Sequence, residues 1–235
     1  MNLQDLQLGM TAAHSCSYLP EHQESLIFTL PDQPLTAELY LQLMQMNFRR
    51  SGDQLYRPYC SSCQACQSVR IDPKQFCARP SQRKLWKKAH KLHWSYQLNW
   101  QPNWQDYYPL YQHYISTKHR DGVMYPPSPE QLSSMFDCPW LPLLTLEQYI
   151  DGELVGVLIL DVLPDAWSAV YSFYQPERII ALGRLAILAV LDAANTENIP
   201  QLYLGFYVSG CQKMAYKADF GPQQRLIEHK WQSFD

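Results

Sequence analysis

The chain has little charge, little glycine and no long hydrophobic run. Charged residues make up 17% of its 235 residues, well below the usual quarter, and 46% of residues are hydrophobic. This balance excludes a disordered chain and predicts a sizeable core. No stretch reaches the about 18 apolar residues of a membrane-spanning helix, and the N-terminus carries no secretion signal. We therefore expect a cytoplasmic protein that does not bind membranes.

Seven cysteines are present, an odd number in a chain without an export signal. A disulfide framework is therefore disfavoured, and metal binding or thiol chemistry is favoured. Cys60, Cys63 and Cys66 follow CxxCxxC spacing, and Cys16 supplies a fourth thiol. Such a set predicts a zinc ion or an iron–sulfur cluster. Free or redox-active thiols are the alternative.

Positive charge is concentrated in one segment. Residues 73–105 hold seven Lys or Arg and no acidic residue, although the whole chain has a net charge of −3. Pro80 and Ser81 predict a helix start with Ser81 as the N-cap. The helix then carries its cations on one side: Arg83, Lys87 and Lys91 in one stripe, with Lys84 and Lys88 beside it. This pattern suits a nucleic acid partner, with Trp86 and Trp94 available to stack on bases, and an ordinary solvated helix face is an equally weighted alternative.

The first 72 residues consist of short, turn-punctuated pieces. A helix is predicted over 36–46 with Thr36 as its N-cap, and a turn at 51–53 between two strands. Further on, regularly spaced aromatic residues over 102–120 predict a helix with an aromatic face that packs in the core.

The second half of the chain has a different pattern. Turns at 151–152 and 164–165 separate three strand-like segments, which predicts an antiparallel meander. A buried helix over 181–199 and a strand over 201–208 follow. This order is typical of GNAT acyltransferases. We therefore expect an α+β protein with a smaller Cys-rich α+β N-terminal domain (1–100) and a GNAT-like acyltransferase domain (101–235).

The loop before the buried helix lacks the usual coenzyme motif. A GNAT enzyme that uses acetyl-CoA carries Gln/Arg-x-x-Gly-x-Gly/Ala here, whose backbone amides hold the pyrophosphate. This chain has Arg178-Ile-Ile-Ala-Leu-Gly183-Arg184, with a single glycine. We therefore expect no CoA and a different acyl donor, and the basic helix predicts that the donor is a nucleic acid.

Several motifs together are recognisable. They are Cys16-Ser-Tyr-Leu-Pro, Phe48-Arg-Arg-Ser-Gly52, Tyr56-Arg-Pro, the CxxCxxC run with Arg70, Ser81-Gln-Arg-Lys, His119-Arg-Asp-Gly122, Tyr171-Ser-Phe-Tyr174 and Tyr203-Leu-Gly205…Gly210-Cys-Gln-Lys-Met-Ala-Tyr-Lys217. Over nearly the whole chain they resemble the aminoacyl-tRNA–protein transferases, and within them the bacterial aspartate/glutamate leucyltransferases, relatives of the eukaryotic arginyltransferases. The chain departs from the family before the buried helix, where the family has Tyr-Asp-Pro-Asp and then Ser-Leu-Gly, and this chain has Tyr174-Gln-Pro-Glu177 and Ala181-Leu-Gly183. Cys16 also lacks a CxxC partner of the eukaryotic kind.

The resemblance implies transfer of leucine from leucyl-tRNA to proteins that begin with Asp or Glu, which creates a degradation signal. The donor is already an activated ester, so no covalent nucleophile is needed. Tyr174 and Tyr207 are the candidate catalytic residues, as hydrogen-bonding partners of the amine or the terminal ribose. The acceptor's carboxylate needs a cation, and Lys213 and Lys217 would share one face if their segment is helical. Further candidates for this role are Arg184, His119 and Arg120.

Three alternatives stay open on the sequence alone. The same fold could transfer arginine from arginyl-tRNA. An ordinary CoA-dependent GNAT acetyltransferase is a second enzymatic alternative. The non-enzymatic alternative is a Cys-cluster module that binds nucleic acid, with the C-terminal half as scaffold.

Overall fold

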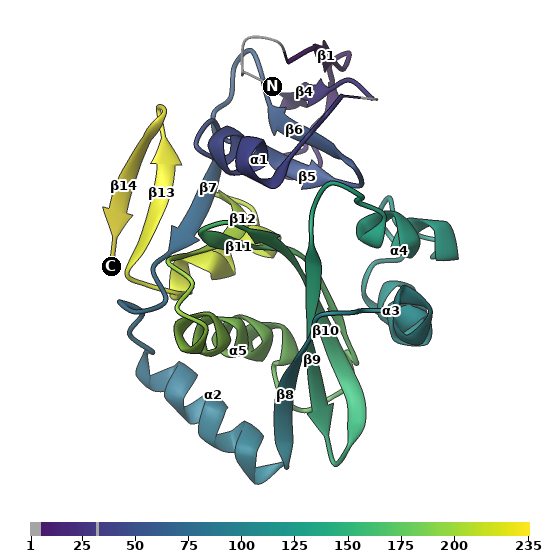
Figure 1. The fold of residues 1–235 in the computed structure, drawn as a ribbon, viewed down its shortest axis with the longest axis vertical. Coiled ribbons are helices and arrows are strands. Elements are labelled where there is room, and N and C mark those ends of the chain that lie inside the picture. Colours follow the sequence, from purple (N-terminus) through teal and green to yellow (C-terminus); the bar gives the residue numbers. More distant parts are fainter. Residues whose placement is uncertain (1–5, 32) are drawn as a thin grey trace.

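A small and a large β-sheet, a two-stranded ribbon of β2 and β3, and several helices make up the protein, as a computed structural model of residues 6–31 and 33–235 shows (Figure 1). The small sheet has the strand order β1-β4-β6-β5, and the large sheet has the order β14-β13-β7-β12-β11-β10-β9-β8. The protein is therefore of the α+β class, as predicted.

The small sheet is built from the N-terminal residues and carries α1 beside it (Figure 1). The side chain of Thr36 caps α1 by accepting from the Leu39 N–H, as predicted. One face of this helix is buried against the large sheet through Tyr40 and Leu43. The elements of this part are β1 (Leu8–Met10), β2 (His14–Ser15), β3 (Gln23–Glu24), β4 (Leu26–Thr29), α1 (Ala37–Met44), β5 (Arg49–Ser51) and β6 (Gln54–Pro58).

The large sheet contains the predicted meander, and β12 adds to it in parallel after α5. This is the GNAT-like unit that the sequence predicted. The hairpin of β13 and β14 extends the sheet beyond β7. The strands are β7 (Cys66–Ile71), β8 (Trp94–Asn99), β9 (Leu143–Ile150), β10 (Glu153–Leu163), β11 (Ala166–Tyr174), β12 (Gln201–Val208), β13 (Gln223–Ile227) and β14 (Lys230–Phe234).

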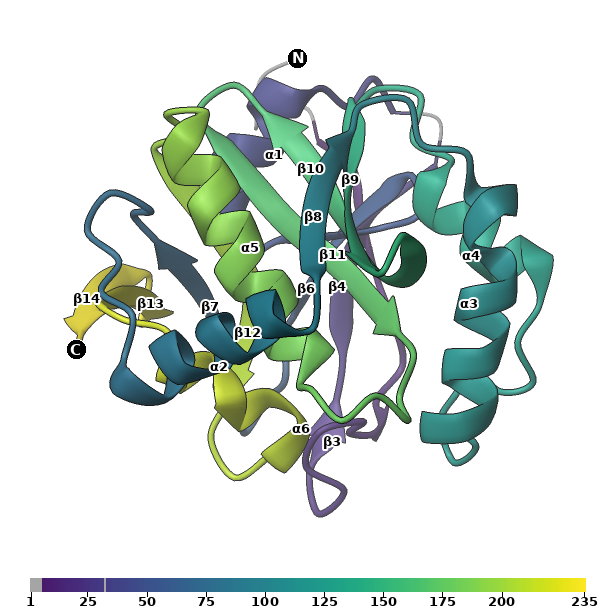
Figure 2. The same cartoon turned by 90° about the horizontal axis from the view of Figure 1, so that it is seen from below.

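Helices cover both faces of the large sheet. α5, which has ten buried residues, lies on one face with α2 outside it, and α3 and α4 lie on the other (Figures 1 and 2). The helices are α2 (Pro80–Lys91), α3 (Trp104–Lys118), α4 (Pro129–Phe136), α5 (Leu182–Thr196), the short α6 (Gln212–Ala215) and a 3₁₀ turn η2 (Tyr216–Asp219).

The strands β11 and β12 pair over only three residues each. Ala166–Ser168 faces Gln201–Tyr203, and beyond these residues the two strands have no ladder between them. On its other side β12 has a bulge next to Gly205, whose φ of +81° a residue with a side chain would adopt only with strain. The carboxyl ends of β11 and β12 therefore leave an opening in the sheet, which we call the strand opening.

The structure differs from the sequence predictions at three places. Residues 66–99, predicted to belong to the N-terminal domain, supply β7, α2 and β8, and both strands lie in the large sheet. The N-cap of α2 is Arg79 rather than Ser81, and its N–H donates to the Gln82 side chain at 2.7 Å. The segment from Cys211 to Lys217 is not one helix, because α6 ends at Ala215 and a 3₁₀ turn follows.

Candidate functional site

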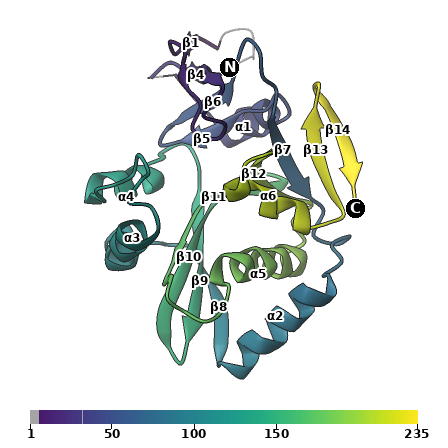
Figure 3. The same cartoon turned by 180° about the vertical axis from the view of Figure 1, so that it is seen from behind.

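Near the carboxyl ends of β11 and β12 lies the short helix α6 (Figure 3). Several tyrosine side chains come together in this region. The ring of Tyr174, the last residue of β11, packs on that of Tyr114 with centroids 4.9 Å apart. The Nε2 of His119 lies 3.1 Å from the Tyr114 hydroxyl. Burial raises the pKa of Tyr216 above its usual 10, and the nearby Tyr174 raises it further. We call Tyr114, His119, Tyr174 and Tyr216 the tyrosine cluster.

His119 and Tyr114 are both uncharged at pH 7. Burial lowers the pKa of His119 below its usual 6.5, and the nearby Lys213 ammonium lowers it further. Burial raises the pKa of Tyr114 above its usual 10, and the neighbouring Tyr174 raises it further. A neutral imidazole beside a protonated tyrosine hydroxyl can accept a proton, which is what deprotonating an amine requires.

Gly183 lets the N-terminus of α5 approach the Tyr174 ring. A Cβ at Gly183 would lie 3.0 Å from Tyr174 Cε1, closer than nearly all real contacts of this kind. Gly183, in the first turn of α5, therefore leaves room for close packing against a candidate catalytic side chain. The neighbouring Arg184 is exposed and pairs with Asp219 at 2.8 Å.

The remaining predicted acceptor-binding residues divide into two groups. Lys213 and Arg120 are exposed, and Lys213 lies 3.7 Å from Asp121. Lys217 is only 5% exposed, and its ammonium donates to the Phe206 carbonyl at 2.6 Å. The prediction that Lys213 and Lys217 share one helix face is wrong, because the chain changes from α6 to the 3₁₀ turn between them.

Tyr207, the second predicted catalytic tyrosine, lies near the end of β12 outside the tyrosine cluster. The Arg225 guanidinium covers its ring at 3.9 Å from the centroid. The structure thus brings Tyr174 and His119 together, and it gives Tyr207 a different environment.

The basic face of α2 is fully presented to solvent. All five of its predicted nucleic-acid-binding cations are exposed, and none of them forms a salt bridge within the part of the chain that the structure describes; they are Arg83, Lys84, Lys87, Lys88 and Lys91. The expected aromatic contribution is wrong for Trp94, which is 2% exposed. Trp94 packs on Trp86 at 5.1 Å, so these rings attach α2 to the sheet.

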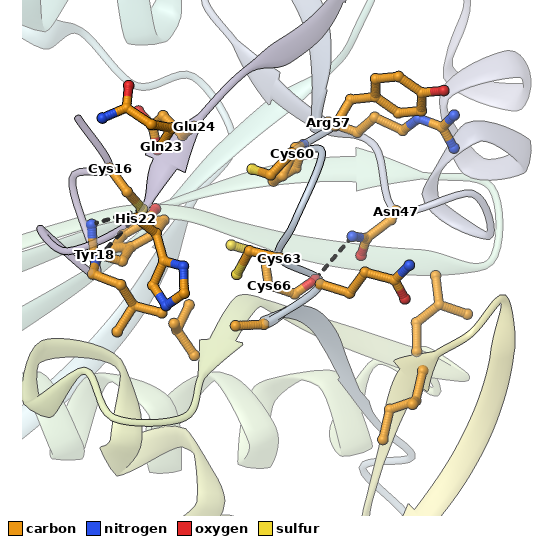
Figure 4. A pocket seen from close by; sticks show the side chains of 18 of the residues that line it. Cys16, Tyr18, His22, Gln23, Glu24, Asn47, Arg57, Cys60, Cys63 and Cys66 are labelled. Atoms are coloured by element: carbon orange, nitrogen blue, oxygen red, sulfur yellow. Dashed lines mark hydrogen bonds between the residues drawn. The ribbon is translucent and has the colours of Figure 1, made fainter. Parts of the chain in front are cut away.

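Four cysteines face one cavity between the N-terminal residues and β7 (Figure 4). The cavity has a volume of about 380 Å³, and Cys16, Cys60, Cys63 and Cys66 contribute to its lining. Burial raises the pKa of the Cys66 thiol to about 12, and the other three cysteines raise it in addition. The N–H groups of Tyr18 and Leu19 both donate to Cys16 Sγ at 3.5 Å.

These thiols have the right chemistry for a thiophilic metal ion and lie in the right region of the chain. In the structure, however, the four sulfur atoms are not arranged around one point as the ligands of a metal ion are. Among residues 6–31 and 33–235, no group of three or more His, Cys, Asp or Glu side chains is arranged to hold a metal ion. The thiols would therefore have to close on a metal.

One buried residue near the paired ends of β11 and β12 could not be predicted from the sequence. Arg49 lies within the Phe48-Arg-Arg-Ser-Gly52 motif, where only the resemblance drew attention to it. It is 5% exposed and reaches from β5 into the strand opening, where its Nη1 lies 3.5 Å from Ser168 Oγ on β11. Charge patterning could not find it, because arginines are usually exposed.

Two family models together match most of the chain. Residues 14–84 match the model of the N terminus of arginine-tRNA-protein transferase, and residues 106–227 match the model of its C terminus. The chain belongs to the arginine-tRNA-protein transferase family. Members of this family are aminoacyl-tRNA–protein transferases, so the enzyme class predicted from the sequence is confirmed.

Curated relatives within this family match nearly the whole chain. An aspartate/glutamate leucyltransferase of Aeromonas salmonicida is 40% identical over 98% of this chain and 96% of its own length. The enzyme of the same name from Pseudomonas putida is 41% identical over 96% of both chains. The predicted resemblance to these leucyltransferases is thereby confirmed.

Among solved structures, the fold is similar to that of a conserved protein of unknown function from Bacteroides thetaiotaomicron. The TM-score is 0.50 at 9% identity, over 67% of this chain and 55% of that one. Such a similarity concerns the fold alone. Within the described ranges of the transferase, no helix is both long enough and apolar enough to cross a membrane.

Proposed function

We propose that this transferase moves leucine from leucyl-tRNA to the N-terminal α-amine of proteins that begin with Asp or Glu. The observation that carries the proposal is the match, at about 40% identity over nearly the full length, to curated aspartate/glutamate leucyltransferases. An N-terminal leucine added in this way would mark the acceptor protein for degradation.

The exposed face of α2 is the proposed binding surface for the tRNA. Five cations without acidic partners attract a polyanion, and each phosphate they neutralise releases counterions. The tRNA would lie along α2 and extend its 3′ end toward the strand opening, since α2 packs on α5 and α5 begins beside Tyr174.

Aminoacyl transfer is proposed to take place at the tyrosine cluster. The acceptor's amine nitrogen attacks the ester carbonyl of leucyl-tRNA, an amide C–N bond forms, and the ester C–O bond to the terminal ribose breaks. The amine loses a proton and the ribose oxygen gains one, so the step is balanced without another reactant. His119, neutral at pH 7, is placed to accept the amine's proton, and the Tyr174 hydroxyl to hydrogen-bond the amine or the ribose.

Exposed cations around the cluster would attract the acidic N-terminus of an acceptor. Lys213 lies near His119, and Arg184 follows Gly183, which packs on Tyr174, although each cation is paired with an aspartate. Arg120 is next to His119 in the chain. Screening by water limits what such exposed cations contribute to affinity. These exposed cations would attract an acidic acceptor, but they would distinguish an N-terminal Asp from an N-terminal Asn only weakly.

The cysteine-lined cavity supports a separate proposal. We propose that Cys16, Cys60, Cys63 and Cys66 hold a zinc ion or an iron–sulfur cluster, because all four thiols face one cavity. A four-thiolate site is closed to further ligands, so it would fix the N-terminal residues to β7 without entering the reaction. Elemental analysis of the purified protein tests this: about one zinc, or iron with sulfide, is expected, and its loss in Cys60→Ser. A fully metal-free, folded protein contradicts it.

A transfer assay with separate donors tests the main proposal. A peptide that begins with Asp is incubated with leucyl-tRNA, arginyl-tRNA or acetyl-CoA, each labelled in its acyl group. Label is expected in the peptide only from leucyl-tRNA. Transfer from arginyl-tRNA alone would favour the activity named in the family description. Transfer from acetyl-CoA alone would place the enzyme among the acetyltransferases.

A further inference from the structure

Arg49 is a buried arginine with unpaired donors. Its side chain is almost withdrawn from solvent, and neither its Nε nor its Nη2 has a hydrogen-bond partner among residues 6–31 and 33–235. The guanidinium lies over the rings of Tyr203 and Phe206 on β12, at 5.5 and 5.9 Å from their centroids. Aromatic faces stabilise a buried cation only in part. Because buried N–H donors without an acceptor cost free energy, an anion bound to them would stabilise the guanidinium.

A second buried cation lies beside it. A Cβ built at Gly205 would lie 3.4 Å from Lys217 Nζ and 3.8 Å from Arg49 Nη2, so both cations approach the same side of this glycine. The partners of Lys217 Nζ in the structure are the Phe206 carbonyl and Met214 Sδ, neither of which carries charge. Two cations thus come together from β5 and η2 without a carboxylate between them.

The nearby buried carboxylate belongs to Asp161, whose Oδ2 has no hydrogen-bond partner among the described residues. Burial raises its pKa, and the charges of Arg50 and, more weakly, Arg49 oppose this shift. Asp161 on β10 is held by Arg50 at 2.8 Å, in a pair that is itself fully buried. Two neighbouring arginines of one motif therefore differ: Arg50 forms an ion pair within the protein, whereas Arg49 forms none among the described residues. Burying like charges together without compensation is costly, and proteins keep such arrangements where a ligand supplies the opposite charge.

The cation pair lies next to the proposed site of chemistry. The ring of Tyr216, a member of the tyrosine cluster, is 5.8 Å from Lys217 Nζ. On the other side, Phe206 and Tyr56 pack edge to face and line a cavity of about 450 Å³. A side-chain carboxylate held at the cation pair would therefore leave its own α-amine near the tyrosine cluster, one short side chain away.

We propose that Arg49 and Lys217 together bind the side-chain carboxylate of the acceptor's first residue, an inference that rests on the proposed leucyl transfer. The guanidinium fork supplies two parallel N–H donors to the two carboxylate oxygens, and the ammonium supplies a further charge. An acceptor that begins with Asn or Gln brings no charge and leaves both cations uncompensated. Selectivity for acidic acceptors is thus set inside the strand opening.

Kinetics with paired acceptors test the assignment. The values of kcat/KM are measured for two peptides that differ only in an N-terminal Asp or Asn, with the wild type, Arg49→Met and Lys217→Met. Each variant is expected to lose at least about 100-fold for the Asp peptide and little for the Asn peptide, with unchanged affinity for leucyl-tRNA. Lys230→Gln, which removes an exposed cation at the first residue of β14, is the control.

An Asp-to-Asn ratio that stays at the wild-type value in both variants overturns the carboxylate site. If the wild type transfers leucine to neither peptide, the proposed function fails, and the site is then tested by binding alone. Lysines of the wild-type protein are labelled with ¹³C at Cε, and Lys217 is titrated by NMR with each peptide, using Lys217→Met for assignment. The Asp peptide is expected to raise the pKa of Lys217 and the Asn peptide to leave it unchanged.

The groups around Lys217 set its pKa in the absence of a peptide. Burial and the charge of Arg49 lower its pKa to about 7, and Cys211 and Cys66 oppose this shift more weakly. A bound carboxylate opposes the effect of Arg49 directly. Equal titration curves with the two peptides overturn the site whatever the activity.

Discussion

Arg50 on β5 and Asp161 on β10 form an ion pair of 2.8 Å in which both side chains are shielded from solvent. Arg50 also donates to the carbonyls of Gly52 and Met135. The pair therefore joins the small sheet, the large sheet and α4 at one buried point.

Replacing Arg50 by Met should lower the free energy of unfolding by about 3–5 kcal/mol, because it leaves the Asp161 carboxylate buried without a partner. Arg49→Met, the same change one residue earlier, should cost less than half as much, since no carboxylate loses its counterion. Urea denaturation of both variants measures this. Equal losses would show that Arg49 is as much a structural residue as Arg50.

Lys217 gives the protein a characteristic pH dependence. With its pKa lowered from 10.5 to about 7, the folded state binds fewer protons than the unfolded chain above pH 7. The contribution of Lys217 to the free energy of unfolding should therefore increase from pH 7 to pH 9. Lys217→Met should remove this increase and stabilise the protein at pH 7 by about 1–3 kcal/mol. Denaturation at several pH values checks both effects, and an unchanged pH slope in the variant would refute them.

Charge reversal on α2 tests the tRNA surface. Changing Arg83, Lys87 and Lys91 together to Glu should weaken tRNA binding by at least about 100-fold at low salt and flatten the salt dependence of the affinity, because fewer counterions are released. Filter binding at several salt concentrations measures both. Lys230→Glu is the control for surface charge. An unchanged salt slope in the triple variant would identify α2 as an ordinary solvated helix.

Gly183→Ala tests the position of Tyr174. Alanine suits a helix better than glycine, so the fold should keep its stability, but the new methyl group must displace the Tyr174 ring. We expect kcat to fall about tenfold or more, and Tyr174→Phe to show a comparable loss. Single-turnover transfer from leucyl-tRNA measures the rate. A Gly183→Ala enzyme with wild-type kcat would exclude a precise role for this ring.

Much of the fold follows from local patterns. Alternation with turn residues at 151–152 and 164–165 predicts the meander correctly, and the continuous apolar run after Leu182 predicts the buried helix. Pairings between distant segments could not be predicted. β7 lies between β12 and β13, more than a hundred residues away in the chain, and nothing in its own sequence specifies these neighbours.

The candidate site could be predicted only in part. His119 and Tyr174 were found through the family resemblance, and the structure brings them together. The expectation that Lys213 and Lys217 share one face required a continuous helix, but α6 ends at Ala215 and a 3₁₀ turn carries Lys217. Arg49 could not be found at all from charge patterning, since its importance comes from burial without a partner, a property that only the folded chain has.

Competition among donors tests the central claim most directly. A peptide that begins with Asp is incubated with the enzyme, a mixture of tRNAs charged with all amino acids, and acetyl-CoA, and the product is sequenced by mass spectrometry. The account predicts one product, with a single leucine joined to the α-amine of the Asp. A peptide that carries an acetyl group or arginine, or that is recovered unchanged, would contradict it.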